Sequence, residues 1–206
     1  MPDIVKRIQD VITQKKCITG LDIGCGSFSV LTKLRPALQS TGIDVYGPAI
    51  DEGKIRDLHD KFILGDVMTH DFEGQRYDVV IANEFIEHLN KEDGWRLLSR
   101  LEALASKLII ITTPNGFLPQ GPEFGNQWQI HKSGWFVNDF TGLGFEVRGT
   151  YGPKFMRGYA NEFKWRGSRL WTPVSELLGS LLVPWPHFHA GLLAIKDMEG
   201  IPAQLK

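Results

Sequence analysis

Two glycines and an aspartate form the first group of residues whose types and spacing can do chemistry. Gly24 and Gly26 flank Cys25 directly after the apolar run 18–23. Glycine lets the backbone come close to a ligand at the carboxyl end of a strand, where open α/β sheets bind. Asp44 ends the next apolar run, 20 residues after Gly24, where a carboxylate can accept hydrogen bonds from ribose hydroxyls. A nucleotide-type cofactor is expected here, and the alternative is a glycine turn that starts a helix and holds no ligand.

A second group of candidate residues follows a later apolar strand pattern. If a helix begins after residue 83, Glu84, Glu87 and His88 are spaced i, i+3 and i+4 and share one helix face. His131, which follows a glycine-rich loop, is a candidate to join them. Carboxylates and imidazoles in one place can bind a divalent ion or act as a base, and the alternative is a helix-capping or loop role.

The elements that must position these residues alternate between strands and helices. Apolar runs predict strands at 18–23, 40–45, 62–64, 77–82, 107–112, 145–150 and 190–195. Helical spacing predicts helices at 1–14, 29–38, 49–58, 84–105, 138–143 and 169–182. Strands that alternate with helices indicate an α/β fold, with a mostly parallel sheet covered on both faces.

Composition limits the class of protein and its partners. The chain has 206 residues with 23 Lys and Arg against 24 Asp and Glu, so a net charge of -1 provides no field for holding a long nucleic acid. The two cysteines, Cys17 and Cys25, do not suggest a disulfide framework and favour a cytoplasmic location. No apolar run reaches the roughly 20 residues that span a bilayer, and the oligomeric state is left open.

Three further features distinguish the glycine turn from a dinucleotide fingerprint. Asp22 precedes the glycines, Phe28 stands where the third glycine belongs, and Gly65-Asp66-Val67 follows the third strand. From about residue 17 to residue 113 the chain resembles the class I S-adenosylmethionine-dependent methyltransferases, particularly the type 11 group. The resemblance implies a Rossmann-like sheet of seven strands with the last strand antiparallel. It also implies a cofactor site in which Asp22, the acid of the first motif, lies near the methionine moiety and Asp44 binds the ribose. The residues implied to line the site are Asp22, Gly24, Cys25, Gly26, Asp66, Val67 and Asn83.

The second group of residues also resembles a known pattern. Ubiquinone-pathway O-methyltransferases and small-RNA 2'-O-methyltransferases carry Glu-x-x-Glu-His, and the latter have a later His near a Trp. The resemblance implies a divalent metal held by Glu84, Glu87, His88 and His131, or a metal-free reaction in which His88, His131 or Glu87 acts in catalysis. Trp128, Trp135 and Phe136 are expected to shape the acceptor site.

These inferences predict one domain over residues 1–206. Residues 1–113 form its cofactor-binding half, and residues 114–206 its acceptor-side half with a loop at 114–130 and an insertion at 154–189. The expected activity is O-methylation of a small-molecule or lipid- or sugar-linked acceptor, with a membrane-surface contact at the insertion as a weaker hypothesis. The alternatives are a non-catalytic S-adenosylmethionine-binding module and a nicotinamide-dependent oxidoreductase.

Overall fold

The computed structural model describes residues 2–123, 125–158, 163–164, 168–182 and 184–200. Seven strands form one sheet in the order β3-β2-β1-β4-β5-β7-β6. Their bounds are β1 Thr19–Ile23, β2 Gln39–Asp44, β3 Lys61–Leu64, β4 Tyr77–Asn83, β5 Ala105–Pro114, β6 Glu146–Pro153 and β7 His189–Asp197. Strand β1 pairs in parallel with β2 and β4, and β2 pairs in parallel with β3. Strand β7 runs antiparallel to β6, which confirms the predicted fold class.

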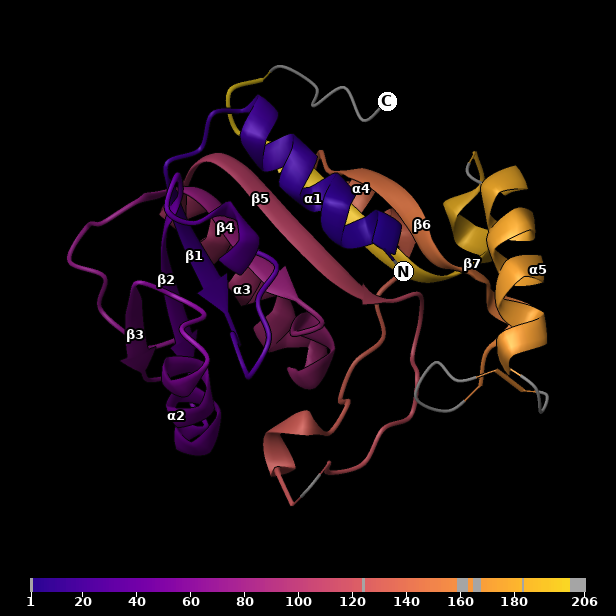
Figure 1. Cartoon of the computed structure of the whole chain (residues 1–206), viewed down its shortest axis with the longest axis horizontal. Coiled ribbons are helices and arrows are strands. Elements are labelled where there is room, and N and C mark those ends of the chain that lie inside the picture. The colour runs from indigo at the N-terminus through magenta and orange to yellow at the C-terminus, as the bar shows by residue number, and fades with distance from the viewer. Residues whose placement is uncertain (1, 124, 159–162, 165–167, 183, 201–206) are drawn as a thin grey trace. The chain divides into compact units, whose positions relative to one another are not determined.

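Five α-helices accompany the described strands (Figure 1): α1 Pro2–Gln14, α2 Gly47–Ile55, α3 Lys91–Leu104, α4 Val137–Thr141 and α5 Ser168–Leu181. Short 3-10 helices lie at Thr32–Leu34, Ile86–His88, Gln127–Gln129, Lys154–Met156 and Pro186–Phe188. No helix in the described ranges is both long enough and apolar enough to cross a membrane.

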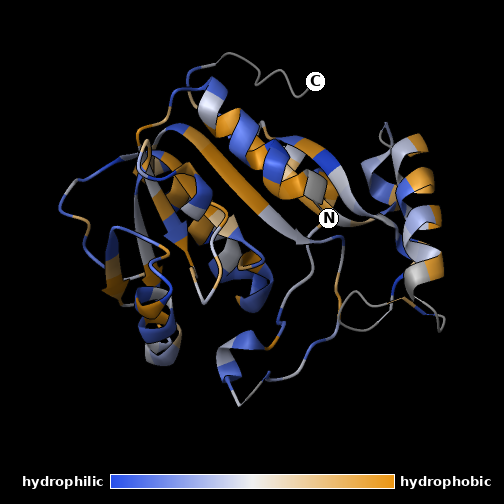
Figure 2. Cartoon of the chain, viewed as in Figure 1, coloured by the Kyte–Doolittle hydropathy of each residue, from blue (hydrophilic) through white to orange (hydrophobic). Residues whose placement is uncertain are grey.

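The chain divides into two compact units. The first comprises residues 1–85, 95–110 and 196–206, and the second comprises residues 86–94 and 111–195. In the first unit α1 buries Ile8, Val11 and Ile12, and the strands β1 and β4 are almost wholly buried. Strand β5 carries a hydrophobic run at 108–111 in its middle (Figure 2), as expected for a central strand that is covered on both faces.

The second unit combines β6, most of β7, α4 and α5. Helix α5 packs along β6, and the closeness depends on glycine, because a Cβ at Gly152 would lie 2.2 Å from the Ser175 Oγ. Pro173 lies inside α5. Of the predicted insertion 154–189, residues 159–162, 165–167 and 183 lie outside the described residues, as does residue 124 of the predicted loop 114–130.

The helix predicted over 29–38 is wrong. Only one 3-10 turn forms there, at Thr32–Leu34. Pro36 has no backbone N–H, and inside a helix its ring would clash with the carbonyl four residues earlier. The Ser29 hydroxyl donates to Asp22 and accepts the Leu31 N–H. The segment is therefore an irregular connection that follows the glycine turn, with Val30 and Leu31 in the core.

The helix predicted over 84–105 is also wrong in its first turns. Glu84 has a positive φ of 49°, a left-handed conformation that interrupts a helix at a non-glycine residue. A 3-10 turn at Ile86–His88 follows, and α3 begins only at Lys91. The assumption that Glu84, Glu87 and His88 share one α-helical face is therefore incorrect.

Candidate functional site

The glycine turn of the first unit connects β1 to the segment before β2. Gly24 and Gly26 both adopt positive φ, 64° and 51°, a region that L side chains rarely adopt. The Phe85 ring packs directly on Gly24, where a Cβ would lie 2.2 Å from its Cδ2 atom. The Gly24 N–H donates to the Ile43 carbonyl at 2.9 Å. The turn thus requires glycine for its conformation and, at Gly24, for close contact with Phe85.

Asp44 fixes this turn to the end of β2. Its Oδ2 accepts the Gly26 N–H at 2.9 Å and its Oδ1 accepts the Tyr46 N–H at 2.8 Å. An ionised carboxylate offers about four lone-pair positions, so two bonds leave acceptor capacity for ribose hydroxyls. The side chain is half-buried at the carboxyl end of the strand, where the sequence analysis expected it.

The other predicted cofactor residues lie at the ends of the first unit's strands. Asp66 follows β3, is exposed, and caps its own turn by accepting the Met68 N–H at 2.8 Å. Val67 beside it is buried. Asn83 ends β4 and is half-buried. These placements agree with a cofactor that runs along the carboxyl edge of β1 to β4, and the role of each residue stays a prediction.

Asp22 and Cys25 lie beneath the turn rather than on its surface. Both are buried, and the Ser29 hydroxyl donates to the Asp22 Oδ2 at 2.5 Å. Burial raises the pKa of the Asp22 carboxyl to about 7, opposed by the Ser29 hydrogen bond and assisted by the charge of Asp44. Burial also raises the pKa of the Cys25 thiol, which fits its interpretation as an apolar filler.

The second unit brings together three of the four predicted metal ligands. Glu87, His88 and His131 each offer one ligand atom, and these atoms lie within 4.8 Å of one another. The His88 and His131 rings meet edge to face with centroids 4.9 Å apart. Glu84 is not a member of this group, because the helical face that would have joined it to Glu87 does not form.

Hydrogen bonds orient each member of this cluster. The His131 Nδ1 lies 2.7 Å from the Leu118 carbonyl, and the His88 Nδ1 lies 3.4 Å from the Ile130 carbonyl. A carbonyl can only accept, so the Nδ1 atoms carry the protons and each Nε2 presents a lone pair. Thr113, which the sequence analysis did not single out, donates to the Glu87 Oε2 at 3.0 Å. The sequence feature that could have indicated Thr113 is a hydroxyl residue near the carboxyl end of an apolar strand.

The backbone of residues 132 and 133 also bonds to the cluster. The Glu87 carbonyl accepts the N–H groups of Lys132 and Ser133 at 2.8 and 3.1 Å. Burial lowers the pKa of His131, while the Leu118 carbonyl and the charge of Glu123 oppose that shift. The imidazole is therefore neutral at physiological pH, the form that accepts a proton or a metal ion.

The expected aromatic lining is partly wrong. Trp135 is fully buried and its Nε1 donates to the Ser133 Oγ at 2.9 Å, so it belongs to the core of the second unit. Trp128 and Phe136 are 55% and 52% exposed, as an acceptor surface requires. Trp135 was misassigned because sequence alone does not distinguish a buried indole from an exposed one.

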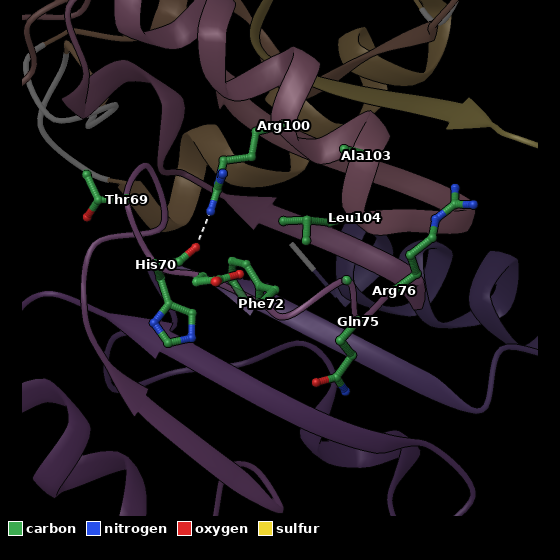
Figure 3. Close-up of a pocket in the computed structure, with 10 residues that line it drawn as sticks. Thr69, His70, Phe72, Gln75, Arg76, Arg100, Ala103 and Leu104 are labelled. Atoms are coloured by element: carbon green, nitrogen blue, oxygen red, sulfur yellow. Dashed lines mark hydrogen bonds between the residues drawn. The ribbon is translucent and has the colours of Figure 1, made fainter.

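A cavity of about 440 Å³ in the first unit is separate from the glycine turn (Figure 3). Its walls come from residues 69–76, which precede β4, and from Arg100, Ala103 and Leu104 of α3. Arg100 donates to the His70 carbonyl across it. Because β4 is parallel to β1, the start of β4 lies at the opposite edge of the sheet from the glycine turn. The cavity is not part of the predicted cofactor site.

Comparison with known proteins agrees with this fold and glycine turn. Residues 21–107 match the type 11 family described as a methyltransferase domain. A structure of a SAM-dependent methyltransferase from Archaeoglobus fulgidus is similar over 94% of this chain and 92% of its own, with a TM-score of 0.61 and 19% identity. Magnesium protoporphyrin IX methyltransferase from Synechocystis PCC 6803, crystallised with bound SAM, is similar over 95% of this chain and 77% of its own, with a TM-score of 0.56 and 16% identity.

One curated relative adds a sequence comparison. A small RNA 2'-O-methyltransferase of Tetrahymena thermophila is 28% identical over 182 residues, which cover 72% of this chain. The match covers 43% of that protein, so the chain spans less than half of its length.

The sheet order with an antiparallel last strand, together with the glycine turn after β1, defines a class I methyltransferase fold. Within that class, residues 21–107 match the type 11 methyltransferase domain family, and the similar structures from Archaeoglobus fulgidus and Synechocystis PCC 6803 are S-adenosylmethionine-dependent methyltransferases.

Proposed function

We propose that this chain transfers a methyl group from S-adenosylmethionine to a hydroxyl oxygen of a small-molecule or a lipid- or sugar-linked acceptor. The observation that carries the proposal is the convergence of Glu87, His88 and His131 in the second unit. A hydroxyl must lose its proton as the oxygen–carbon bond forms and the methyl–sulfur bond breaks, with S-adenosylhomocysteine leaving. Two imidazoles and a carboxylate can receive or direct that proton.

The chemistry of the donor set fits a divalent metal ion. One carboxylate and two imidazoles, with both Nε2 lone pairs set by carbonyl bonds at Nδ1, match the ligand preferences of Mn, Fe or Zn better than those of Mg. Thr113 holds the Glu87 carboxylate in place. When bound, the ion would supply Lewis-acid chemistry that eases proton loss from the acceptor. Without an ion, the Nε2 of His88 or His131 takes the role of general base.

The experiment combines chelation with variants of the cluster. Glu87→Gln and His131→Gln should each cut methyl transfer from labelled S-adenosylmethionine at least about 100-fold, assayed on a panel of hydroxyl acceptors. Affinity for S-adenosylhomocysteine should stay within about twofold, because these side chains act on the acceptor. His187→Gln, at an exposed histidine outside the cluster, is the matched control.

The outcomes separate the two versions of the mechanism. Loss of activity on chelation and recovery with Mn²⁺ would support the metal. Activity that resists chelation but falls on acidification would support the general base, and for His131 the fall should lie below the ordinary histidine pKa because burial lowers the pKa of that imidazole. Full activity of both cluster variants would contradict the proposal.

A second acceptor class is the 2'-hydroxyl of a terminal ribose in a short single-stranded RNA. The relative from Tetrahymena thermophila favours it, as does the exposed Trp128 with the Lys132 ammonium 5.9 Å from its ring centroid. Exposed aromatic rings beside cations are common platforms for single-stranded nucleic acid. Methylation of an oligoribonucleotide, but not of its analogue with a terminal 2'-deoxyribose, would select this class over small molecules.

A further inference from the structure

A row of polar side chains lies buried beneath the glycine turn of the first unit. The Ser29 Oγ bonds the Asp22 Oδ2 at 2.5 Å, and the His59 Nε2 lies 3.6 Å from the same carboxylate oxygen. On the other side of the imidazole ring, the His59 Nδ1 lies 3.0 Å from the Ser40 Oγ. All four residues are at most 7% exposed. The row runs from the segment after the turn, across β1, to the start of β2.

Strand β2 leaves an opening through which His59 reaches Asp22. Asp22 pairs with Gly42 in the register of β1 and β2. A Cβ at Gly42 would lie 2.6 Å from the His59 Cδ2 and 2.8 Å from the Cys25 Sγ. The ring occupies the space that a side chain at position 42 would fill, and Phe62 packs against it edge to face at 5.4 Å. The contact between His59 and Asp22 therefore depends on glycine at position 42 of β2, because any side chain there would occupy the place of the imidazole ring.

The charges around the pair favour a neutral imidazole. Burial lowers the pKa of His59 to about 4, assisted by the charge of Arg35 and opposed by that of Asp60. Among the described residues, the His59 Nε2 has no hydrogen-bond partner, and the Asp22 Oδ2 lies 3.6 Å from it, close enough for the ring dipole to act on the carboxyl. The other groups that act on Asp22 are the Ser29 hydroxyl and the carboxylate of Asp44.

A neutral imidazole anchored on a hydroxyl suits either protonation state of Asp22. If Ser40 donates to Nδ1, then Nε2 carries a hydrogen that faces the ionised carboxylate. If Nδ1 donates to Ser40 instead, Nε2 presents a lone pair to the protonated carboxyl. A rigid apolar ring in this place would remove the Nε2 dipole from the neighbourhood of the buried carboxyl, which the Ser29 hydroxyl alone would then have to satisfy, at a cost in free energy.

We propose that His59 is a positioning residue of the cofactor site, which holds the Asp22 carboxyl through Nε2 and thereby holds the segment from Gly24 to Val30. Ser29 transmits the effect, because its hydroxyl bonds Asp22 and also accepts the Leu31 N–H at 3.1 Å. The inference rests on the proposed function, in which this turn contacts S-adenosylmethionine. His59 itself is buried and acts only through Asp22.

Two substitutions of similar polarity separate the two ends of the imidazole. His59→Gln keeps a polar nitrogen near the place of Nε2, so it can still reach Asp22. His59→Asn keeps one near the place of Nδ1, so it can bond Ser40 but not reach Asp22. We expect the Asn variant to bind S-adenosylhomocysteine about tenfold more weakly by calorimetry, and the Gln variant to bind like the unmodified protein. His189→Gln, at a buried histidine of the second unit, controls for the loss of any buried imidazole.

A second readout does not depend on the cofactor. Carbon-detected NMR can follow the titration of the Asp22 carboxyl in the unliganded protein. Loss of the Nε2 partner should shift its midpoint by about one pH unit in His59→Asn, upward if Nε2 carries a hydrogen and downward if it presents a lone pair, and leave it unchanged in His59→Gln. If the Asn variant does not fold, Ser40→Ala tests the same idea, because it releases the ring from its anchor and should move both readouts in the same direction.

The outcomes test the role of His59 and the proposed function separately. Equal Asp22 midpoints and equal affinities in the Gln and Asn variants would overturn the role of His59. A shifted midpoint without any change in affinity would also overturn it, because the effect would not reach the cofactor site. If the unmodified protein does not bind S-adenosylhomocysteine, the proposed function fails, whereas the Asp22 titration still decides whether His59 holds the carboxyl.

Discussion

Asp22 and His59 give the folding stability of the first unit two opposing pH dependences. The pKa of Asp22 is raised from 3.8 to about 7, so the native state holds its proton more tightly and stability falls as pH rises from about 4 to 7. The pKa of His59 is lowered from 6.5 to about 4, so stability falls as pH drops from 6.5 to 4. Between those limits the native and unfolded states bind similar numbers of protons at this pair, and the two slopes nearly cancel.

In Asp22→Asn, the dependence of folding stability on pH that comes from His59 should become measurable. The variant should lose stability on acidification from pH 6.5 to 4, and at pH 7.5 it should be more stable than the unmodified protein by on the order of 2 kcal/mol, because no buried carboxylate remains to be ionised. Urea unfolding at a series of pH values measures both effects. Parallel stability curves for the two proteins would contradict this reading of the pair.

The individual site residues differ in how far sequence could place them. The glycine turn and Asp44 follow from a local pattern, since both lie at the carboxyl ends of strands, where open α/β sheets place their ligand contacts. The convergence of His131 with Glu87 and His88 was predicted from an assumed helical spacing together with a family resemblance. His59 gave no signal, because its proximity to Asp22 is created by Gly42 in a neighbouring strand. Such a contact is tertiary and has no sequence spacing of its own.

At the scale of elements, the start of α3 is fixed by the close approach of an indole. A Cβ at Gly94 would lie 2.2 Å from the Cζ2 of the fully buried Trp135. The Lys91 ammonium, one turn earlier, lies 3.6 Å from the centroid of the same ring and bonds Asp139 at 2.7 Å. Glycine inside a helix costs about 1 kcal/mol relative to alanine, and here it is required by the packing.

Gly94→Ala should therefore destabilise the protein by roughly 1 to 3 kcal/mol despite the better helix propensity of alanine, because the added methyl overlaps a side chain with no space to move. Gly47→Ala is the matched control, since Gly47 is the first residue of α2 and no heavy atom lies within 4 Å of its added Cβ. Chemical unfolding measures both. Equal stability of the two variants would show that Trp135 does not constrain α3.

The elements themselves were predicted well where hydrophobic periodicity was strong. All seven strands appear close to their predicted ranges, and the pattern is clearest for β1 and β4, which are short buried apolar runs bounded by turns. Periodicity failed where single residues decide the backbone, at Pro36 and at the left-handed Glu84. The second failure matters for function, since it removed Glu84 from the expected ligand set.

At the scale of the whole molecule, the alternation of strands and helices was sufficient to predict the fold class. The seven-stranded order and the antiparallel last strand confirm it. The predicted organisation as one domain with halves that meet at residue 113 stays a prediction, as do the cytoplasmic location and the acceptor. The chain passes from one compact unit to the other at residues 86, 95, 111 and 196. No single boundary along the sequence therefore separates the two units.

The central claim is that the carboxyl ends of β1 and β2 form the S-adenosylmethionine site. Calorimetric titration with S-adenosylhomocysteine tests it most directly, in the unmodified protein, in Asp44→Ala and in Asp51→Ala, whose carboxylate is exposed on α2. We predict one site per chain and a loss in Asp44→Ala of about tenfold to 100-fold in affinity, the value of charge-assisted bonds to two ribose hydroxyls. Asp51→Ala should bind normally. Undiminished affinity in a folded Asp44→Ala protein, or no binding to the unmodified chain, would contradict the claim.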